Sequence, residues 1–311
     1  GDGIDLSGVD PFTSGVASMS VAERLFGIIP MNPFASLANG EVLPIIFFSI
    51  LLGIGIIMGG EKTKPIGNFF SAAAEAVLKV AHMVMQVAPY GVLSLVAWVS
   101  GTMGLAALQN LLVLTLILYF GCLFHMVFVY GSLIRIFAKL PLKNFFRGIL
   151  DAQAVAYSTS SSSATLPVTL QCVQENLGVK KTVASSVLPL GATINMDGTA
   201  LYLGIVALFA AQIFGIDLTF TDYLLIAMTA TLTSIGTAGI PSASLFLLAT
   251  VLSVIGVSDN QTALIVGFVL PFDRILDMAR TAVNITGDAT VSVLVAKSEN
   301  EIDEDVFRKN A

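Results

Sequence analysis

Charged residues are scarce in this chain, and they are missing altogether from its longest apolar runs. Asp, Glu, Lys and Arg make up 12% of the 311 residues, about half of what is typical of soluble domains. None of them occurs in the runs 42–60, 80–134 and 223–258. A membrane-spanning helix needs about 20 apolar residues. The period-2 alternation that outer-membrane barrels require is also missing. We therefore predict an all-α membrane protein with multiple transmembrane helices.

Cysteine and histidine are equally rare, and this limits the chemistry that the chain can perform. Cys122 and Cys172 lie in apolar surroundings with no partner spacing, which predicts two small core residues and neither a disulfide nor a metal site. The only histidines, His82 and His125, stand alone among apolar neighbours, which favours satisfied buried or interfacial side chains. An intramembrane serine hydrolase needs a base within reach of its nucleophile, and both histidines precede the serine-rich stretch described below. We therefore expect a protein that is not an enzyme and has no catalytic residues.

Basic residues are missing between positions 182 and 273, and those that precede this gap indicate a topology. A basic loop spans 135–147, and the positive-inside rule places it in the cytoplasm. Lys180 and Lys181 form the next basic site, which we expect on the same side. The segment 152–179 must therefore enter the membrane and return.

Two apolar segments are interrupted in a way that predicts re-entrant helical hairpins. The first contains STSSSSATLP (158–167), flanked by arms too short to cross a bilayer. The second is broken at SIGTAGIP (234–241), and its first arm, 223–233, is also too short. The acidic residues around the second segment place both of its ends on the opposite side. Inverted pairs of broken elements are typical of a transporter's midplane site, although a loop or a kinked span remains an alternative for each.

The composition of the two breaks suits ligand binding. Non-helical backbone at membrane depth survives only where protein or a wet cavity satisfies it, and hydroxyl groups can serve this purpose. Glycine lets backbone approach a ligand closely. The N-terminus of a half-helix favours a carboxylate, and free carbonyl groups suit a desolvated cation.

A polar stripe follows the last predicted helix, in PFDRILDMARTAVNITGDAT (271–290). Charges inside a transmembrane helix are costly and mark function by default. At 100° per residue, five polar groups lie within roughly 80° of one another: Asp273, Asp277, Arg280, Asn284 and Asp288. Asp277 and Arg280 could simply pair with each other. Arg274 lies off the stripe, where we expect a local ion pair.

The stripe carries the groups that a zwitterion with an extra carboxylate requires. Arg280 would hold the side-chain carboxylate and Asp277 the ammonium group. Asp288 and Asp197 remain as hard oxygen ligands for a cation such as Na⁺. Asp197 lies in GATINMDGTALY (191–202), which predicts a helix broken at membrane depth. A glycine kink with a solvated Asp is the alternative there.

Four motifs resemble one family in order and spacing: TSSSSATLP, LPLGATINMDGTALY, SIGTAGIP and DMARTAVNITGDA. The chain is similar, over essentially its whole length, to the sodium/dicarboxylate (excitatory amino-acid, glutamate/aspartate) symporters. The resemblance implies a secondary active symporter that works by an elevator mechanism. It also implies a homotrimer in the lipid bilayer of the plasma (cell inner) membrane, with no nucleic-acid partner. About three N-terminal helices of the family are expected to be missing from this sequence.

The resemblance also implies the ligand sets. Ser162 and Asn284 would hold the α-carboxylate. Asp277 and Thr281 would hold the ammonium group, aided by carbonyl groups near Ser160 and Ile240. The full set of substrate-binding residues implied is Ser160, Ser162, Thr199, Ile240, Asp277, Arg280, Thr281 and Asn284. Three sodium sites are implied, formed by Gly191, Asn195, Asn284 and Asp288, by Thr193, Ser234, Ile235 and Thr237, and by the side chains of Asn195 and Asp197.

The family pattern further implies a domain organisation. Residues 1–142 would be mainly scaffold helices and linkers, and residues 143–301 the transport domain. That domain would contain a first hairpin over about 143–179, a helix over about 180–216, a second hairpin over about 220–261 and a last helix over about 263–298. Residues 299–311 would form a polar tail.

Within this family, the presence of both Asp277 and Arg280 implies an acidic amino acid as the substrate, and the resemblance implies Na⁺ as the coupling ion with no other cofactor. Many members of the family carry a second arginine near the substrate, but the corresponding positions here are Ser160 and Met278. A proton-coupled glutamate/aspartate or C4-dicarboxylate symporter remains an alternative. A carrier with a dominant anion-channel activity is another.

Overall fold

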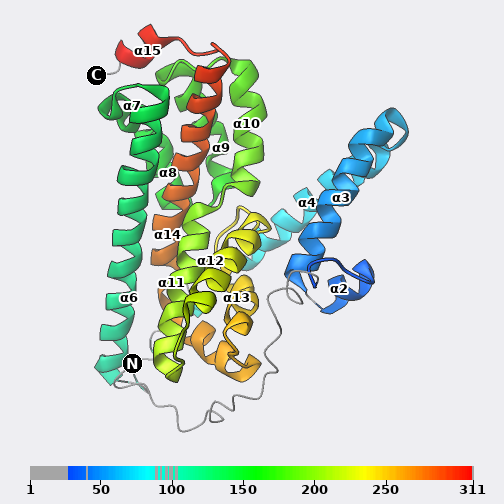
Figure 1. The fold of residues 1–311 in the computed structure, drawn as a ribbon, viewed down its shortest axis with the longest axis vertical. Helices are drawn as coiled ribbons and strands as arrows, with labels where there is room; N and C mark the ends of the chain where they lie inside the picture. The colour runs from blue at the N-terminus through cyan, green and yellow to red at the C-terminus, as the bar shows by residue number, and fades with distance from the viewer. Residues whose placement is uncertain are drawn as a thin grey trace.

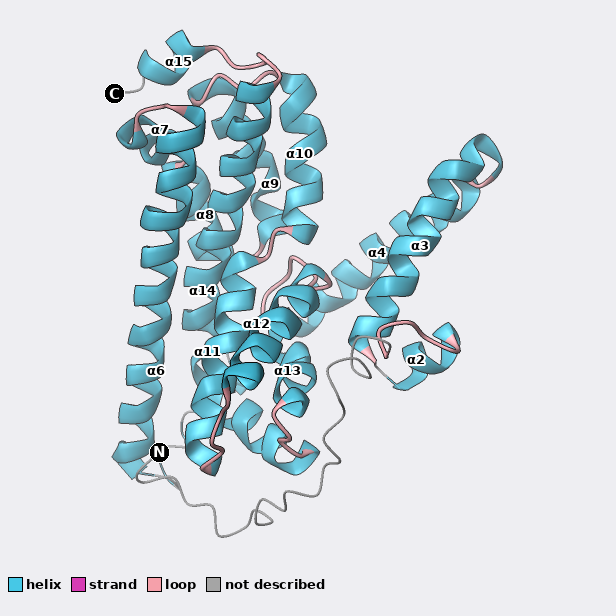
Figure 2. Cartoon of the chain, viewed as in Figure 1, coloured by secondary structure: helices cyan, strands magenta, loops and turns pink. Residues whose placement is uncertain are grey.

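The computed structural model describes residues 27–39, 41–87 and 104–309, with a few single residues between 90 and 101 (Figure 1). The described chain is helical, and its only β-contact is an isolated bridge between Val179 and Ile302 (Figure 2). Three of the described helical stretches are long and apolar enough to cross a membrane: Leu43–Lys62, Gln109–Ala138 and Lys181–Phe214. The predicted all-α fold is therefore confirmed for the described residues, with helices that are long and apolar enough to cross a membrane.

The N-terminal helices form an arm that projects from the main bundle (Figure 1). It consists of α2 (Pro33–Asn39), α3 (Val42–Gly59), a short 3₁₀ turn (Gly60–Lys62) and α4 (Lys64–Met85). The arm meets the bundle where α3 packs against α12 (Phe220–Ile235). α3 also contacts α2 and α4, but no residue of its most hydrophobic window is buried. Such a surface is stable in lipid, whose tails are as apolar as the side chains themselves.

The helices that lead into and out of the serine-rich stretch come next in the chain. These are α6 (Gly104–Phe124), which continues through two wide π-type turns (His125–Tyr130 and Leu133–Ala138), α7 (Leu142–Gly148), α8 (Leu150–Thr159) and α9 (Ser162–Gln171), which ends in another such turn (Cys172–Asn176). At about 1.5 Å per residue, the ten residues of α8 and of α9 each extend about 15 Å. Each arm is therefore about half as long as a bilayer core is thick.

The next predicted helix, over 180–216, is two helices in the structure. They are α10 (Lys181–Ile194) and α11 (Asp197–Phe214), separated at Asn195 and Met196. The predicted break at this motif is thus confirmed. After α12, the chain crosses a non-helical segment and returns through a 3₁₀ turn (Ala243–Leu247) and α13 (Leu248–Val254).

The last long helix, α14 (Asp259–Ser298), is the spine of the bundle. It begins four residues before the predicted start because Ser258 and Gln261 form a capping box, in which each side chain bonds the other residue's backbone N–H. It packs against α6, α8, α10 and α11. Figure 1 shows α8, α9 and α10 in one half of the bundle, α11, α12 and α13 in the other, and α14 running through both.

Two large apolar cores and one small apolar cluster (Ala152, Ala156, Cys172 and Ile285) lie along α14, together with a layer of buried polar residues. One core joins α6, α11, α12, α13 and the first half of α14, and the other joins α7, α10 and the end of α14. Cys122 and Cys172 are free and buried, as predicted. The polar layer contains the stripe of α14 and the serine-rich stretch. Buried polar groups are stable only when they are paired, so this layer is where a binding site is expected.

The polar tail predicted over 299–311 is docked in its described part. It ends in α15 (Glu304–Lys309), whose Phe307 is fully buried. The side chain of Asn144 in α7 donates hydrogen bonds to the carbonyl oxygens of Phe307 and Arg308, both at 3.1 Å. The backbone N–H of Asp303 donates to the carbonyl oxygen of Gly178, at 2.8 Å. Residue 178 must be glycine, because its φ is +66° and a Cβ there would lie 2.3 Å from the Asp303 oxygen.

Candidate functional site

The two interrupted segments meet at their tips. Only Ser160 and Ser161 separate α8 from α9, and Ser160 adopts a left-handed conformation with φ of 53°. The hydroxyl of Ser161 donates to the carbonyl oxygen of Gly239, at 2.6 Å. The backbone N–H of Ser163 donates to the same oxygen, at 3.3 Å. These bonds join the serine-rich stretch directly to the break after α12.

Hydroxyl groups of the first tip form hydrogen bonds with nearby backbone groups. Ser161 is the N-cap of α9 and accepts a hydrogen bond from the N–H of Ala164, at 3.1 Å. Thr159 donates to the carbonyl oxygen of Val155, and Thr165 to that of Ser161, each at 2.8 Å. The hydroxyl groups of Thr159 and Thr165 thus find their partners close by in the chain, and the Ser161 hydroxyl satisfies one of the N–H groups that the start of α9 leaves free.

Arg280, on the stripe of α14, is buried with a relative exposure of 1%. Its Nε lies 2.7 Å from Oδ1 of Asp277, and its Nη2 lies 3.2 Å from Oδ1 of Asp273. Its guanidinium carbon lies 4.3 Å from the centre of the Tyr202 ring, a cation–π contact. The pairing of Asp277 with Arg280, expected as an alternative, is thus present. It does not use the whole guanidinium group, because Nη1 is buried and has no partner.

Asp277 also connects α14 to the second tip, which is the non-helical segment after α12. Its Oδ1 accepts a further hydrogen bond from the hydroxyl of Thr281, at 3.3 Å. Its Oδ2 accepts one from the backbone N–H of Ser242, at 2.7 Å. Ser242 has a left-handed φ of 60°, which aims its N–H at the carboxylate. The carboxylate of Asp277 therefore contacts both Arg280 and the segment that follows α12.

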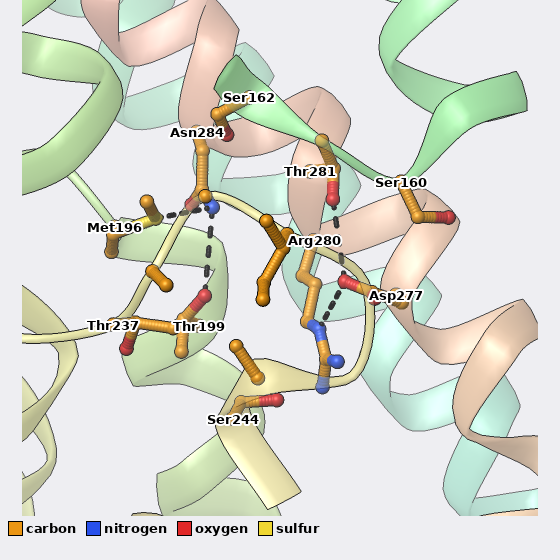
Figure 3. Close-up of a pocket in the computed structure, with 14 residues that line it drawn as sticks. Ser160, Ser162, Met196, Thr199, Thr237, Ser244, Asp277, Arg280, Thr281 and Asn284 are labelled. Atoms are coloured by element: carbon orange, nitrogen blue, oxygen red, sulfur yellow. Dashed lines mark hydrogen bonds and ion pairs between the residues drawn. The ribbon is translucent and has the colours of Figure 1, made fainter. Parts of the chain in front are cut away.

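All eight predicted substrate-binding residues line one cavity between the two tips and α14 (Figure 3). The remaining lining residues are Met196, Thr237, Ala238, Gly239, Ala243 and Ser244. Four unpaired polar atoms belong to this lining: Ser160 Oγ, Thr237 Oγ1, Ser244 Oγ and Arg280 Nη1. Buried polar atoms are normally paired, so this concentration indicates groups that are free to bind a ligand. The roles of the eight residues as ligands remain a prediction.

The break between α10 and α11 packs against the same part of α14. Asn284 Oδ1 accepts a hydrogen bond from the backbone N–H of Gly198, at 2.8 Å. Its amide nitrogen lies 3.2 Å from the sulfur of Met196 and 3.5 Å from the hydroxyl of Thr199. A Cβ at Gly198 would lie 2.2 Å from the carbonyl oxygen of Arg280. Glycine is therefore required for the two helices to approach this closely.

The structure brings together the four residues of the first predicted sodium site. The amide nitrogen of Asn195 donates to the carbonyl oxygen of Asn284, at 3.2 Å, and to Oδ1 of Asp288, at 3.0 Å. A Cβ at Gly191 would lie 2.5 Å from the same Asp288 oxygen. Carboxylate and carbonyl oxygens are the ligands that hard cations prefer. The carboxylate and carbonyl oxygen atoms of these residues therefore fit a cation such as Na⁺.

The residues of the other two predicted sodium sites are not brought together in the same way. For the second set, α10 and α12 are in contact, but Thr193 is exposed and its hydroxyl donates to the carbonyl oxygen of Leu190, at 2.9 Å. Ser234 and Thr237 are buried and Ile235 is partly buried at the end of α12. For the third set, the Asn195 amide is turned toward Asp288, whereas Oδ2 of Asp197 accepts a hydrogen bond from the hydroxyl of Tyr130, at 2.6 Å.

Several contacts of the site were not predicted from the sequence. His125 Nε2 lies 3.6 Å from Asp197 Oδ2, so this histidine is not isolated. Tyr202 under Arg280 and the backbone N–H of Ser242 carried no local sequence signal. The local ion pair expected for Arg274 does not occur among the ion pairs of the described residues. Its side chain contacts backbone carbonyl groups of α8 instead.

Residues 10–298 match the model of the sodium:dicarboxylate symporter family. The chain belongs to this family. Its members are transporters and not enzymes, in agreement with the prediction.

Individual relatives cover nearly the whole chain. The proton/sodium-glutamate symport protein of Geobacillus stearothermophilus is 36% identical over 293 residues, which are 94% of this chain and 68% of the relative. The proton/glutamate-aspartate symporter of Escherichia coli is 37% identical over 303 residues, 96% of this chain and 68% of the relative. A C4-dicarboxylate transport protein of Rhizobium johnstonii is 34% identical over 309 residues, 97% of this chain and 68% of the relative.

Proposed function

We propose that this protein is a secondary active symporter that imports glutamate or aspartate, coupled to Na⁺. The observation that carries the proposal is the cavity in which the free Nη1 of Arg280 and the carboxylate of Asp277 lie side by side. An acidic amino acid has a side-chain carboxylate for the first and an ammonium group for the second. The unpaired hydroxyl groups of Ser160 and Ser244 add neutral partners.

Asp277 argues against a simple dicarboxylate as the main substrate. A C4-dicarboxylate has no ammonium group, and its second carboxylate would face the carboxylate of Asp277. Like charges at close range in a low-dielectric site repel strongly. The name of the Rhizobium johnstonii relative keeps C4-dicarboxylates as the second candidate.

Substrate entry requires part of the site to move. The free volume of the cavity is about 10 Å³, close to the minimum for one water molecule. The segment 237–244 is held over it by a few hydrogen bonds, to Ser161, Ser163 and Asp277. We propose that this segment opens to admit the substrate, and that the tips close again over it.

The proposal includes two re-entrant hairpins that enter from opposite sides and a moving transport domain, as an elevator requires. The half-length arms α8 and α9 and the contact between the tips support the hairpins. We propose that α6 belongs to the same body, and its contacts with α11 and α14 support this. The moving part would then begin before residue 143, and the arm of α3 and α4 would belong to the scaffold. The homotrimer and the bacterial plasma membrane belong to the proposal as well.

Na⁺ is the proposed coupling ion because Gly191, Asn195, Asn284 and Asp288 converge on one point. Proton coupling is the second candidate, since buried carboxylates such as Asp288 can carry protons. The name of the Escherichia coli relative points in that direction.

Uptake of labelled aspartate and glutamate into proteoliposomes tests the proposal. A Na⁺ gradient at equal pH should drive accumulation of either substrate. Accumulation driven only by a pH gradient in Na⁺-free buffer would replace Na⁺ with protons. Absence of uptake under both gradients, with labelled succinate transported instead, would show that the substrate assignment is wrong.

The variant Arg280→Cys tests the site itself. It removes the group proposed to bind the side-chain carboxylate, so uptake of aspartate and glutamate should be lost, and uptake of a neutral amino acid such as serine should be gained. An anion current that is independent of substrate and unaffected by this variant would instead favour a channel as the main activity.

A further inference from the structure

Arg274 connects α14 to the tip of the first hairpin. Its Nη2 lies 3.3 Å from the carbonyl oxygen of Ser158 and 3.2 Å from that of Thr159. These are the last two residues of α8. The final carbonyl groups of a helix have no partner within the helix, and a cationic side chain there is favoured by both hydrogen bonding and the helix dipole.

The next residue along the chain faces the cavity. Ser160 follows Thr159 directly, its φ is 53°, and its unpaired hydroxyl belongs to the lining. A non-glycine residue in this conformation persists only where its surroundings hold it. On one side the tip is bound to Gly239, and on the other side Arg274 holds the end of α8.

We infer that Arg274 is a positioning residue of the substrate site, which acts through the first tip and does not touch the substrate. It is not part of the cavity lining. Its guanidinium group binds the two carbonyl oxygens that precede Ser160 and thereby fixes the direction of the Ser160 hydroxyl. The inference rests on the proposed function, since the proposed substrate is the ligand that the Ser160 hydroxyl would contact.

A second connection keeps α8 in place when Arg274 is changed. The hydroxyl of Tyr119 in α6 donates to the carbonyl oxygen of Ile275, at 2.9 Å, and lies 3.0 Å from the hydroxyl of Tyr157 in α8. The three helices α6, α8 and α14 are therefore joined independently of the guanidinium group. A variant at position 274 should keep its fold and lose the order of the tip alone.

The variant Arg274→Gln should raise the KM for aspartate about five- to thirtyfold, with a maximal rate within about twofold of the wild type. A tip that adopts the binding conformation only part of the time weakens apparent affinity by that fraction. A change in KM at constant maximal rate indicates lost ground-state and transition-state binding alike. Arg274→Lys should give an intermediate KM, because an ammonium group retains the charge but not the planar pair of donors.

A double-mutant cycle in the intact protein separates this role from a general loss of stability. Ser160→Ala removes the hydroxyl that Arg274 is inferred to position, so the effects of Arg274→Gln and Ser160→Ala on KM should be less than additive. Arg135→Gln neutralises an exposed arginine on η3 (Leu133–Ala138) and should leave KM unchanged. Circular dichroism and thermal unfolding of each variant establish that it is folded.

Two outcomes would overturn the inference. One is a KM for Arg274→Gln equal to that of Arg135→Gln, and the other is full additivity with Ser160→Ala. If Arg274→Gln does not fold, a wild-type KM for a folded Arg274→Lys would overturn the inference as well. A wild-type protein that transports neither aspartate nor glutamate would contradict the proposed function and is recognised in the same assay.

Discussion

Gly239 is the point at which a single methyl group should separate the tips of the two interrupted segments. A Cβ added there would lie 2.5 Å from the hydroxyl oxygen of Ser163, 3.1 Å from its backbone nitrogen and 3.2 Å from the carbonyl oxygen of Ala192. The hydroxyl can rotate away, but the two backbone atoms belong to α9 and α10 and cannot. Gly239→Ala should therefore push the second tip outward.

The magnitude follows from the bonds that this movement breaks. The carbonyl oxygen of Gly239 accepts hydrogen bonds from the Ser161 hydroxyl and the Ser163 N–H. Each contributes about 0.5–1.5 kcal/mol, so losing both costs the closed arrangement about 1–3 kcal/mol. A coupling of this size corresponds to about 5–150-fold in an equilibrium constant.

The assay is equilibrium binding of labelled aspartate to the purified protein at saturating Na⁺. Gly239→Ala should weaken binding within that range. Gly204→Ala is the matched control, because a Cβ at Gly204 in α11 meets nothing within 4 Å, and alanine is the better helix former. Equal affinities for the two variants would refute the conclusion that contact between the tips stabilises the bound state.

Two further substitutions test other parts of the structure. Gly191→Ala places a methyl group 2.5 Å from Oδ1 of Asp288 and should raise the Na⁺ concentration for half-maximal uptake about tenfold, measured as uptake against Na⁺ concentration. The second substitution concerns Glu304 in α15. A hydrogen bond from Lys297 lowers the pKa of the Glu304 carboxyl group below the usual 4.5. Docking of α15 should therefore be strongest above about pH 5 and weaken as the pH falls through that lowered pKa. Hydrogen exchange over 301–309 measures this change, and Glu304→Gln should remove it.

Each of these two predictions has an outcome that contradicts it. An unchanged Na⁺ dependence in Gly191→Ala, together with weaker substrate binding, would mean that Asp288 does not hold the coupling ion. Hydrogen exchange of the C-terminal segment that depends equally on pH in Glu304→Gln and wild type would assign the effect to another group.

The parts of the fold that could be predicted from sequence are those fixed by local patterns. The stripe from Asp273 to Asp288 follows directly from the helical period, and all of its five polar members are buried. The break before Asp197 was visible because Asn, Asp and Gly in sequence interrupt an apolar helix. The break within 158–167 was visible because a run of Ser and Thr interrupts an apolar segment, and the one within 234–241 because Gly and Pro do so.

Contacts between distant backbone and side-chain groups were not predictable in this way. The bond from the Ser242 N–H to Asp277 depends on a left-handed backbone conformation at a residue that usually avoids it. The positions of Tyr202 beneath Arg280 and of Arg274 at the end of α8 depend on how helices pack. The helical wheel places Arg274 off the stripe but does not show which helix lies next to it.

The docking of α15 has a consequence for the order in which the protein is completed during translation. Gly178 lies in the loop between α9 and α10, and its carbonyl oxygen gains the Asp303 N–H as a partner only after residue 303 has been synthesised. Until then, the burial site of Phe307 beside α7 is an open apolar surface. Nascent chains that stall within α14 should therefore expose this surface to chaperones and proteases. The surface should become covered only when α15 has been synthesised.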